Sequence, residues 1–470
     1  MKLRQWQSEC ISKAWHKFTT SENHFLCLAT PGAGKTVMAS SLANKLLQEN
    51  KIDLVLCFSP SVIVADDFEH VLSVRMNVRM DGLLGSKGRS LTYQAMLHLD
   101  ASFWKLFDSN RIFVIFDEIH HCAGDGFGNA NAWGQKIIEN IQGRAAYTLA
   151  LTGTPWRSDQ IPIALSRYCQ SNKIHCDYAY GLTQAVADNV CRTPVITLID
   201  NDRVFVKQNN EVLKYSSFGD LLRESKCSYQ QLIENEDLIS YIINKSSKRL
   251  LTIRKQFPNA GGLIVAASVE HANKIAGILH QRTGEKAYIA TYREENPLSI
   301  INTFKYNSEK WIVSVGMISE GTNIPRLRVC CHLTKVKTEL HFRQVLGRIL
   351  RSNNEIKSEG FLYMPAEPNL IEYATRVAQE IPEGAPIKFE SMSTAKDVED
   401  ESIILTTNQN SDKGMTLDIG NDPTYEVNLR FVENNQQELT SLAESYETNI
   451  NIFGKFRQEL ISLQLGILIA

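Results

Sequence analysis

The sequence of 470 residues contains no apolar run of the length, about 18 residues, that a membrane-spanning helix needs. Its N-terminus is polar and includes Trp6, which is unlike the apolar core of a secretory leader. We therefore expect no membrane contact and a cytoplasmic location.

Disulfides and structural zinc have little support, although ten cysteines are present. No two cysteines are spaced as C-x-x-C, and the adjacent Cys330 and Cys331 lie in an apolar run. Others, such as Cys27, fall in apparent core strands, so we expect buried reduced thiols. One short cluster has residue types that can ligate a metal: His120, His121 and Cys122.

The net charge is low, because 50 lysines and arginines are balanced by 52 acidic residues and the formal charge is −2. Nucleic-acid binding therefore has no global basic character to support it, although a cleft can be locally positive on a neutral protein. Hydrophobic content of 43% and charged content of 22% are typical of a globular chain. Because one core stops growing at about 250–300 residues, we expect two or more domains.

A glycine-rich loop follows the first apolar run, residues 25–28. Gly32 and Gly34 would let backbone amides turn inward around phosphate oxygens, where a Cβ would intrude. Lys35 would bring its charge to the β- and γ-phosphates, and the next hydroxyl, Thr36, would ligate Mg²⁺. Alanine stands where the usual pattern begins with glycine, so a chance match to a loosened pattern is the alternative. The predicted ATP-binding loop consists of Thr30, Pro31, Gly32, Ala33, Gly34, Lys35 and Thr36.

Two carboxylates follow another apolar run, residues 111–116. Such a run is typical of a buried parallel strand, whose C-terminal end lies at the ligand-binding edge of an α/β sheet. Asp117 would hold Mg²⁺ there through water, and Glu118 would polarise the attacking water. Solvated loop acids are the alternative, which the presence of Lys35 upstream disfavours.

The segment Asp117-Glu118-Ile119-His120 resembles the DExH branch of superfamily 2 helicases and translocases, and the family's other motifs occur in its order. The resemblance covers residues 3–378 and is closest to XPB and RadD-type repair helicases and type III restriction translocases. The other matching segments are Leu3-Arg4-Gln5-Trp6-Gln7, Ser59-Pro60-Ser61, Leu91-Thr92-Tyr93-Gln94, Leu151-Thr152-Gly153-Thr154-Pro155, Glu320-Gly321-Thr322-Asn323-Ile324-Pro325 and Gln344-Val345-Leu346-Gly347-Arg348-Ile349-Leu350-Arg351.

The resemblance implies an ATP site shared between two domains. Lys35, Asp117 and Glu118 would act from the first domain, and Arg348 and Arg351 would reach across from the second as arginine fingers. Because the arginines lie on the opposite domain, hydrolysis would require closure of the cleft. His120 would then belong to the family signature rather than to a metal site.

The resemblance also implies contacts around this site. Arg4 and Gln7 would bind ATP, with Gln7 reading adenine, and Gly321 and Asn323 would lie near the ribose. Asn323 replaces the usual aspartate and brings no charge. The residues implied to couple the ATP site to the facing domain are His120, Thr152, Thr154 and Gln344. The implied nucleic-acid contacts are Ser59, Ser61, Thr92, Tyr93, Ser268 and Ser314, although each serine or threonine hydroxyl taken singly is better explained as that of a turn or cap residue.

Alternating strand-like and helix-like stretches predict a parallel α/β architecture, and the resemblance implies two tandem RecA-like domains with the ATP cleft between them. The expected divisions are a first domain at 1–190, a connector with an insertion at 191–258, a second domain at 259–378, a polar linker at 379–432 and a helical tail at 433–470. Strands are predicted near residues 25–28, 54–58, 112–116, 147–151, 261–266 and 311–315.

The expected function is that of an ATP-dependent helicase or translocase with ATP and Mg²⁺, acting on DNA rather than RNA, as the motor of a repair, restriction or phage-defence assembly. The alternative is a nucleotide-gated scaffold that binds nucleic acid without turnover. Apolar residues of the tail recur at helical spacing. This tail would either pack on the motor or dock a partner protein or a second copy.

Overall fold

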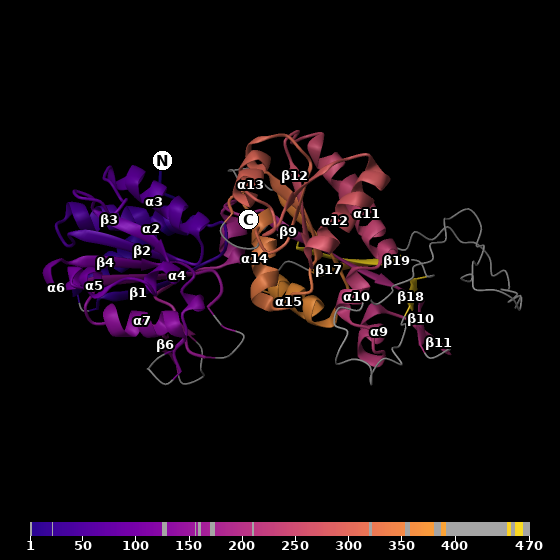
Figure 1. Ribbon diagram of the computed structural model, residues 1–470, viewed down its shortest axis with the longest axis horizontal. Coiled ribbons are helices and arrows are strands. Elements are labelled where there is room, and N and C mark those ends of the chain that lie inside the picture. Colours follow the sequence, from indigo (N-terminus) through magenta and orange to yellow (C-terminus); the bar gives the residue numbers. More distant parts are fainter. Residues whose placement is uncertain are drawn as a thin grey trace, which may run out of the picture.

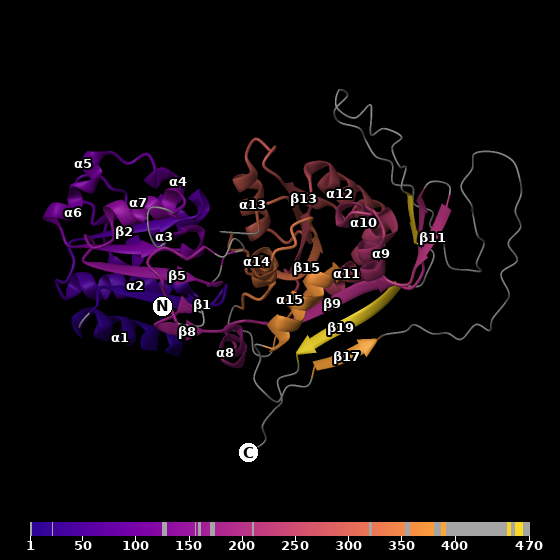
Figure 2. The same ribbon diagram turned by 90° about the horizontal axis from the view of Figure 1, so that it is seen from below.

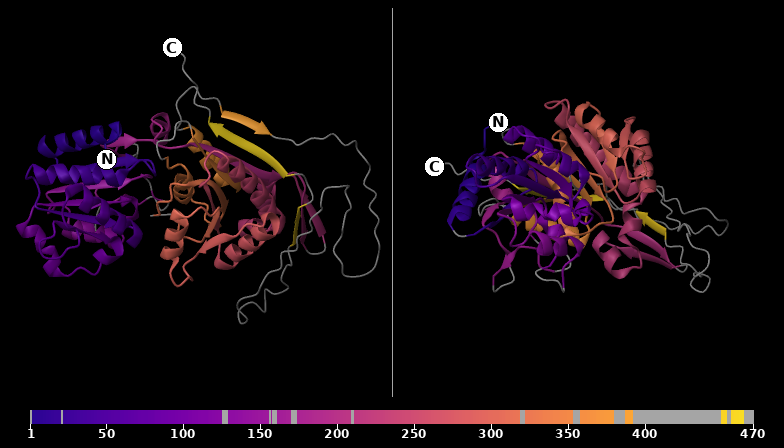
Figure 3. Two further views of the ribbon diagram at one scale, coloured as in Figure 1. Left: turned by 90° about the horizontal axis from the view of Figure 1, so that it is seen from above. Right: turned by 60° about the vertical axis from the view of Figure 1, so that its left-hand side comes forward.

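The computed structural model consists of two α/β units that lie side by side, the indigo-to-purple unit and the pink-to-orange unit of Figure 1. Two further views in Figure 3 show the same division. Gly321 and most of the predicted linker and tail lie outside the described residues. These are 2–20, 22–124, 129–155, 157, 161–169, 174–208, 211–318, 322–352, 358–379, 387–391, 449–452 and 456–463.

The first unit is built on a six-stranded sheet whose order is β3-β2-β4-β5-β1-β8 and whose neighbouring strands are all parallel. The predicted strands here are confirmed. The sheet strands are β1 (His24–Ala29), β2 (Leu54–Ser59), β3 (Gly88–Thr92), β4 (Ile112–Phe116), β5 (Tyr147–Thr152) and β8 (Tyr178–Tyr180), and a separate two-stranded sheet is formed by β6 (Arg167–Tyr168) and β7 (Ile174–His175). The helical segments are α1 (Gln5–Thr20), α2 (Lys35–Gln48), α3 (Val62–Met76), α4 (Tyr93–Met96), α5 (Ala101–Trp104), α6 (Leu106–Ser109), η1 (Ile119–His121), α7 (Ala132–Asn140) and α8 (Leu182–Ala187).

Strand β4, which corresponds to a predicted apolar run, is covered on both of its faces. All five of its residues are buried, and alternate side chains point to opposite faces of a strand. Phe113 and Ile115 join the core that also contains residues of α1 and α2, whereas Val114 and Phe116 join the core beside α4 and α7. Helices on both faces therefore bury the strand completely.

The second unit contains an eight-stranded sheet with the order β13-β14-β12-β15-β16-β9-β19-β17. The first six strands are parallel, and β19 and β17 run antiparallel to their neighbours. Its strands are β9 (Thr193–Asn201), β12 (Gly261–Ala266), β13 (Ala287–Ala290), β14 (Trp311–Ser314), β15 (Leu327–Leu333), β16 (Glu359–Pro365), β17 (Ile387–Ser391) and β19 (Phe456–Leu463). Its helices are α9 (Phe218–Glu224), α10 (Tyr229–Ile233), α11 (Glu236–Arg254), α12 (Val269–Thr283), α13 (Pro297–Tyr306), α14 (Glu339–Ile349) and α15 (Pro368–Gln379).

The expected connector at residues 191–258 is corrected by this sheet. Strand β9 pairs in parallel with β16 over seven residues, from Thr193 opposite Glu359 to Ile199 opposite Pro365. Helix α11 (Glu236–Arg254), which lies within the expected connector, packs on β15 and α12 of the second unit. The second unit therefore begins near residue 192, and the inserted part includes the hairpin of β10 (Val204–Gln208) and β11 (Glu211–Tyr215).

The predicted helical tail is also wrong where the structure describes it. Residues 449–452 form β18, which pairs with β10, and residues 456–463 form β19, which pairs antiparallel with β9. Figure 2 shows β19 lying along β9, with β17 outside it. An apolar spacing of three or four residues in a short segment does not separate helix from strand. The unpaired N–H and C=O groups that β9 would otherwise present at the sheet edge favour the strand.

We predict that a fragment of residues 259–470 will not fold, whereas a fragment of residues 191–470 will. The first lacks β9 and α11, which bury Val195, Ile196, Leu198, Ile199, Leu238, Ile239, Ile242, Ile243 and Leu250. At roughly 1.5–3 kcal/mol for each buried side chain, these residues outweigh a typical net stability of about 5–15 kcal/mol. Circular dichroism during heating provides the measurement. Cooperative unfolding of the shorter fragment would contradict the corrected boundary.

Candidate functional site

The predicted phosphate loop joins the end of β1 to the start of α2. Gly32 and Gly34 have φ angles of 85° and 97°, in the left-handed region that side chains with a Cβ rarely adopt. Gly34 is also the residue that precedes α2, so the positive N-terminal end of this helix lies at the loop. The Thr30 amide donates to the carbonyl of Tyr180, which ties the loop to strand β8.

Arg4 and Gln7 reach this loop from the start of α1. The Arg4 Nη1 atom donates to the Ala33 carbonyl at 2.7 Å, and the Gln7 Nε2 atom donates to the Gly34 carbonyl at 3.0 Å. The Gln7 Oε1 atom accepts from the Arg4 amide at 2.9 Å. The two residues are therefore placed beside the loop as expected, and their contact with adenine stays a prediction.

Lys35 and Glu118 form an ion pair at the centre of the site, with 2.7 Å between Nζ and Oε1. The other carboxylate oxygen of Glu118 accepts from the Gly153 amide at 3.0 Å. Glu118 has a φ of 48°, an unusual backbone angle for a residue with a side chain. Its surroundings therefore hold this carboxylate in one position between the phosphate loop and the end of β5.

The pKa values of the two carboxylates are shifted in opposite directions. Burial, and then the charge of Glu118, raise the pKa of Asp117 to about 7. Burial opposes ionisation of Glu118 too, but Lys35 and the hydrogen bond with His120 hold its pKa well below the usual value. Glu118 is therefore ionised more readily than Asp117.

The residues present fit a magnesium ion in their chemistry. Mg²⁺ prefers hard oxygen ligands and binds through one or two carboxylates together with substrate phosphates. Asp117 is a buried carboxylate whose charge is disfavoured by burial and by Glu118, and a cation beside it would remove that cost. The hydroxyl of Thr36, in the first turn of α2, would be the second oxygen donor.

The predicted coupling residues of the first unit meet beside Glu118. His120 Nδ1 lies 3.0 Å from Thr152 Oγ1 and 3.5 Å from Thr154 Oγ1. The Thr154 amide donates back to Thr152 Oγ1 at 3.0 Å. Gln344 is buried on α14 of the second unit, and its carbonyl accepts from Arg348.

Arg351 brings the second unit to the phosphate loop. Its Cγ atom lies 2.9 Å from the position that a Cβ on Gly32 would occupy. Its Nη1 atom donates to Asn323 Oδ1 at 2.6 Å, so Asn323 is held at the same place. Arg348 is buried and donates to the carbonyl of Thr322 at 2.7 Å, within its own unit. Arg351 thus lies beside the phosphate loop, its role as an arginine finger stays a prediction, and Arg348 secures the loop that carries Asn323.

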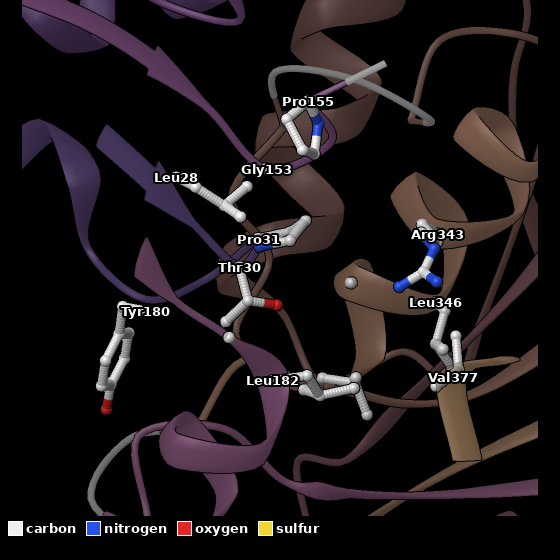
Figure 4. Close-up of a pocket in the computed structure, with 13 residues that line it drawn as sticks. Leu28, Thr30, Pro31, Gly153, Pro155, Tyr180, Leu182, Arg343, Leu346 and Val377 are labelled. Carbon is white, nitrogen blue, oxygen red and sulfur yellow. The ribbon is translucent and has the colours of Figure 1, made fainter. Parts of the chain in front are cut away.

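The sequence did not indicate the contacts of Pro31 with the second unit. A Cβ on Gly347 would lie 2.6 Å from Pro31 Cβ, and Cys191 Sγ lies 3.7 Å from the Pro31 carbonyl. A cavity of about 210 Å³ adjoins this contact. Figure 4 shows Thr30 and Pro31 on one side of it and Arg343 and Leu346 of α14 on the other. No local pattern marks such contacts, because they depend on how the two units meet.

The predicted nucleic-acid contacts divide into two groups. Ser59, Tyr93 and Ser314 are buried, so the prediction that their hydroxyls face a strand is wrong. Tyr93 instead donates to the carbonyl of Asp117 at 2.9 Å and stacks on Trp133. The remaining three precede helices as N-caps, and nucleic-acid contact stays a prediction for these: Ser61, Thr92 and Ser268.

The described residues contain no group of metal-ligating side chains and no helix that could span a membrane. In that part of the chain no three His, Cys, Asp or Glu side chains are grouped to hold a metal ion, and His120, His121 and Cys122 are not such a group. No helix within the same residues is long and apolar enough to cross a membrane.

We predict that Tyr93→Phe will destabilise the protein and leave nucleic-acid binding unchanged. The substitution keeps the ring and removes the donor to a buried carbonyl, which costs about 1–3 kcal/mol. The midpoint of urea unfolding provides the measurement, with binding of labelled oligonucleotides measured in parallel. Weakened binding at unchanged stability would show that Tyr93 contacts the strand after all.

Comparison with known proteins agrees with these motifs. The family model of the type III restriction enzyme res subunit matches residues 1–157. An uncharacterized protein of Mycobacterium leprae is 29% identical over 391 residues, which cover 80% of this chain and 64% of the relative. The chain thus spans a little under two thirds of that relative's length. The DNA 3'-5' translocase XPB2 of Sulfurisphaera tokodaii is 22% identical over 384 residues, or 76% of this chain and 80% of the relative.

A solved structure shows the same fold. The ATP-dependent type ISP restriction-modification enzyme LlaBIII, bound to DNA, aligns with a TM-score of 0.53 at 15% identity, covering 81% of this chain and 30% of that chain. The solved structure shows a fold of two tandem RecA-like sheets, and the family model and the translocase relative agree with the resemblance of the motifs to superfamily 2 helicases.

Proposed function

We propose that this protein hydrolyses ATP between its two units and uses the resulting motion to translocate along or remodel DNA. The observation that carries the proposal is the position of Arg351, which extends from the second unit against Gly32 of the phosphate loop. Such a position lets one unit complete the site of the other, so that turnover depends on how the units are arranged.

Binding of ATP would begin on the first unit. The amides around Gly32 and Gly34 and the N-terminal end of α2 would hold the phosphates. Lys35 would exchange its partner Glu118 for phosphate oxygens, since both are anions within its reach. Arg4 and Gln7 would keep the loop in shape through their bonds to Ala33 and Gly34.

The exchange at Lys35 would release one oxygen of Glu118 to orient water. The hydrogen bond with His120 would still favour the ionised carboxylate by lowering its pKa, and the bond from the Gly153 amide would keep it in place. Asp117 and Thr36 would hold Mg²⁺, which when bound neutralises charge on the phosphates. His120, Thr152 and Thr154 would link the position of Glu118 to motion of the neighbouring loop.

The second unit would act on the transition state. Arg351 carries a permanent positive charge toward the phosphate loop, and arginines in this role accelerate phosphoryl transfer by about 10³–10⁵. Asn323 would orient Arg351 through their hydrogen bond of 2.6 Å and lie near the ribose.

The choice of DNA is supported by the relatives rather than by the site. XPB2 is described as a DNA translocase and LlaBIII was solved with DNA. Contacts to phosphates through Ser61, Thr92 and Ser268 would be largely independent of sequence and sensitive to salt. A role as the motor of a repair, restriction or phage-defence assembly is part of this proposal.

The direct test is the ATPase rate of the full chain with single-stranded DNA, duplex DNA or RNA, each supplied alone. We expect stimulation by DNA that decreases as salt increases. Stimulation by RNA alone would redirect the proposal to RNA. A rate that no nucleic acid changes would exclude a nucleic-acid motor.

We predict that Lys35→Ala will abolish turnover by removing the charge that binds the triphosphate, and that Glu118→Gln will stop hydrolysis but keep ATP binding. Steady-state ATPase and binding of a fluorescent ATP analogue separate the two effects. Hydrolysis by Glu118→Gln near the wild-type rate would mean that another group orients the water.

We also predict that Gly347→Ala will lower ATP turnover without lowering stability. Alanine stabilises a helix by about 1 kcal/mol relative to glycine, but its methyl group would press against Pro31 and separate the units. A displacement near 1 Å can cost about 100-fold in rate. The matched control is Gly277→Ala on α12, where a Cβ would meet nothing within 4 Å. Equal turnover in both variants would show that this contact is not needed.

A further inference from the structure

Arg192 lies at the junction of the two units and belongs to none of the motifs. Helix α8 of the first unit ends at Ala187, and strand β9 of the second begins at Thr193. The Arg192 side chain is only 1% exposed. Burying a guanidinium is costly unless its donors are bonded and its charge is balanced.

The donors of Arg192 are bonded to main-chain carbonyls from two separate segments. Its Nη1 atom donates to Ile349 at 3.0 Å and to Leu327 at 2.7 Å, and its Nη2 atom donates to Pro325 at 3.0 Å. Its backbone amide donates to the carbonyl of Leu350 at 2.7 Å. One residue therefore holds the end of α14 and the start of β15 together.

The position at the end of α14 also balances the charge. Ile349 is the last residue of this helix and Leu350 is its C-cap. The final carbonyls of a helix lack donors within the helix and carry a partial negative charge. Arg192 supplies both the missing donors and a positive charge at this point.

The two segments held by Arg192 lead directly to the residues that meet the phosphate loop. Arg351 follows Leu350 and forms a backbone bridge with Cys191, the neighbour of Arg192. Asn323 lies two residues before Pro325 and accepts from Arg351. The distance between these segments therefore determines where Arg351 stands relative to Gly32.

We propose that Arg192 is a positioning residue for ATP hydrolysis, which acts by fixing Arg351 and Asn323 against the phosphate loop. This inference rests on the proposed function. The planar guanidinium reaches three carbonyls in fixed directions, and an ammonium on a flexible stem cannot reproduce that arrangement. Lysine at this position is therefore expected to keep the charge and lose the geometry.

The test is a double-mutant cycle with Arg192→Lys and Arg351→Ala in the full chain, with Arg192→Gln as a second replacement. In the wild-type background we expect kcat to fall about 10- to 100-fold, with the KM for ATP changed less than about twofold. In the Arg351→Ala background we expect no further fall beyond about twofold, because Arg192 acts through Arg351.

The matched control is Arg254→Met. Arg254 also donates to two main-chain carbonyls of the second unit, those of Ala260 and Ser308, but far along the chain from either motif. This variant should keep the wild-type kcat. An unchanged kcat in Arg192→Lys, or an equal fall in both backgrounds, would overturn the proposal.

Hydrogen exchange tests the inference without relying on turnover. Amides of residues 349–352 should exchange at least about tenfold faster in Arg192→Lys than in the wild type, because this segment opens locally more often. The exchange rates of the same amides should not change in Arg254→Met. Unchanged exchange in Arg192→Lys would overturn the inference. A wild-type chain without ATPase activity would overturn the proposed function and with it the role in hydrolysis, whereas faster exchange in Arg192→Lys would still show that Arg192 fixes residues 349–352.

Discussion

The contact between the end of α14 and the phosphate loop is the constraint on which the candidate site depends. Gly347 and Gly153 both lie against Pro31, so closely that a Cβ on either would press on the proline ring. Interiors are packed at the density of crystals, so backbones approach this closely only where side chains are absent. The small residues therefore let two separately folded sheets share one site.

The same contact explains how the charges of the site are arranged. Lys35 is paired with Glu118, and Arg351 donates to the neutral Asn323 while the charge of Asp67 also acts on it. A neutral partner orients the guanidinium and leaves its charge available for phosphate oxygens. The replacement of the usual aspartate by Asn323 is thus compatible with a working arginine, because an aspartate there would compete with phosphate.

Much of the fold could be predicted from the sequence because its signals are local. The run Ile112 to Phe116 is long and apolar enough to require a strand buried on both faces, and Gly32 and Gly34 indicate a loop with left-handed residues. The pairing of β9 with β16 could not be predicted, since about 160 residues separate them and register leaves no mark in either strand. The strand β19 was missed because its apolar spacing suits a helix equally well.

In the candidate site too, only the features with a local sequence signal could be predicted. Motif residues such as Lys35, Glu118 and Arg351 were found because their chemistry requires a fixed residue type. Tyr93 was misassigned because a motif position does not reveal which way a side chain points, and its hydroxyl points inward to Asp117. Arg192 has no sequence signal at all. Three of its hydrogen bonds go to backbone carbonyls, which every residue type carries, so the sequence around them shows no mark. Its importance depends on where the chain brings those carbonyls, which only the three-dimensional arrangement reveals.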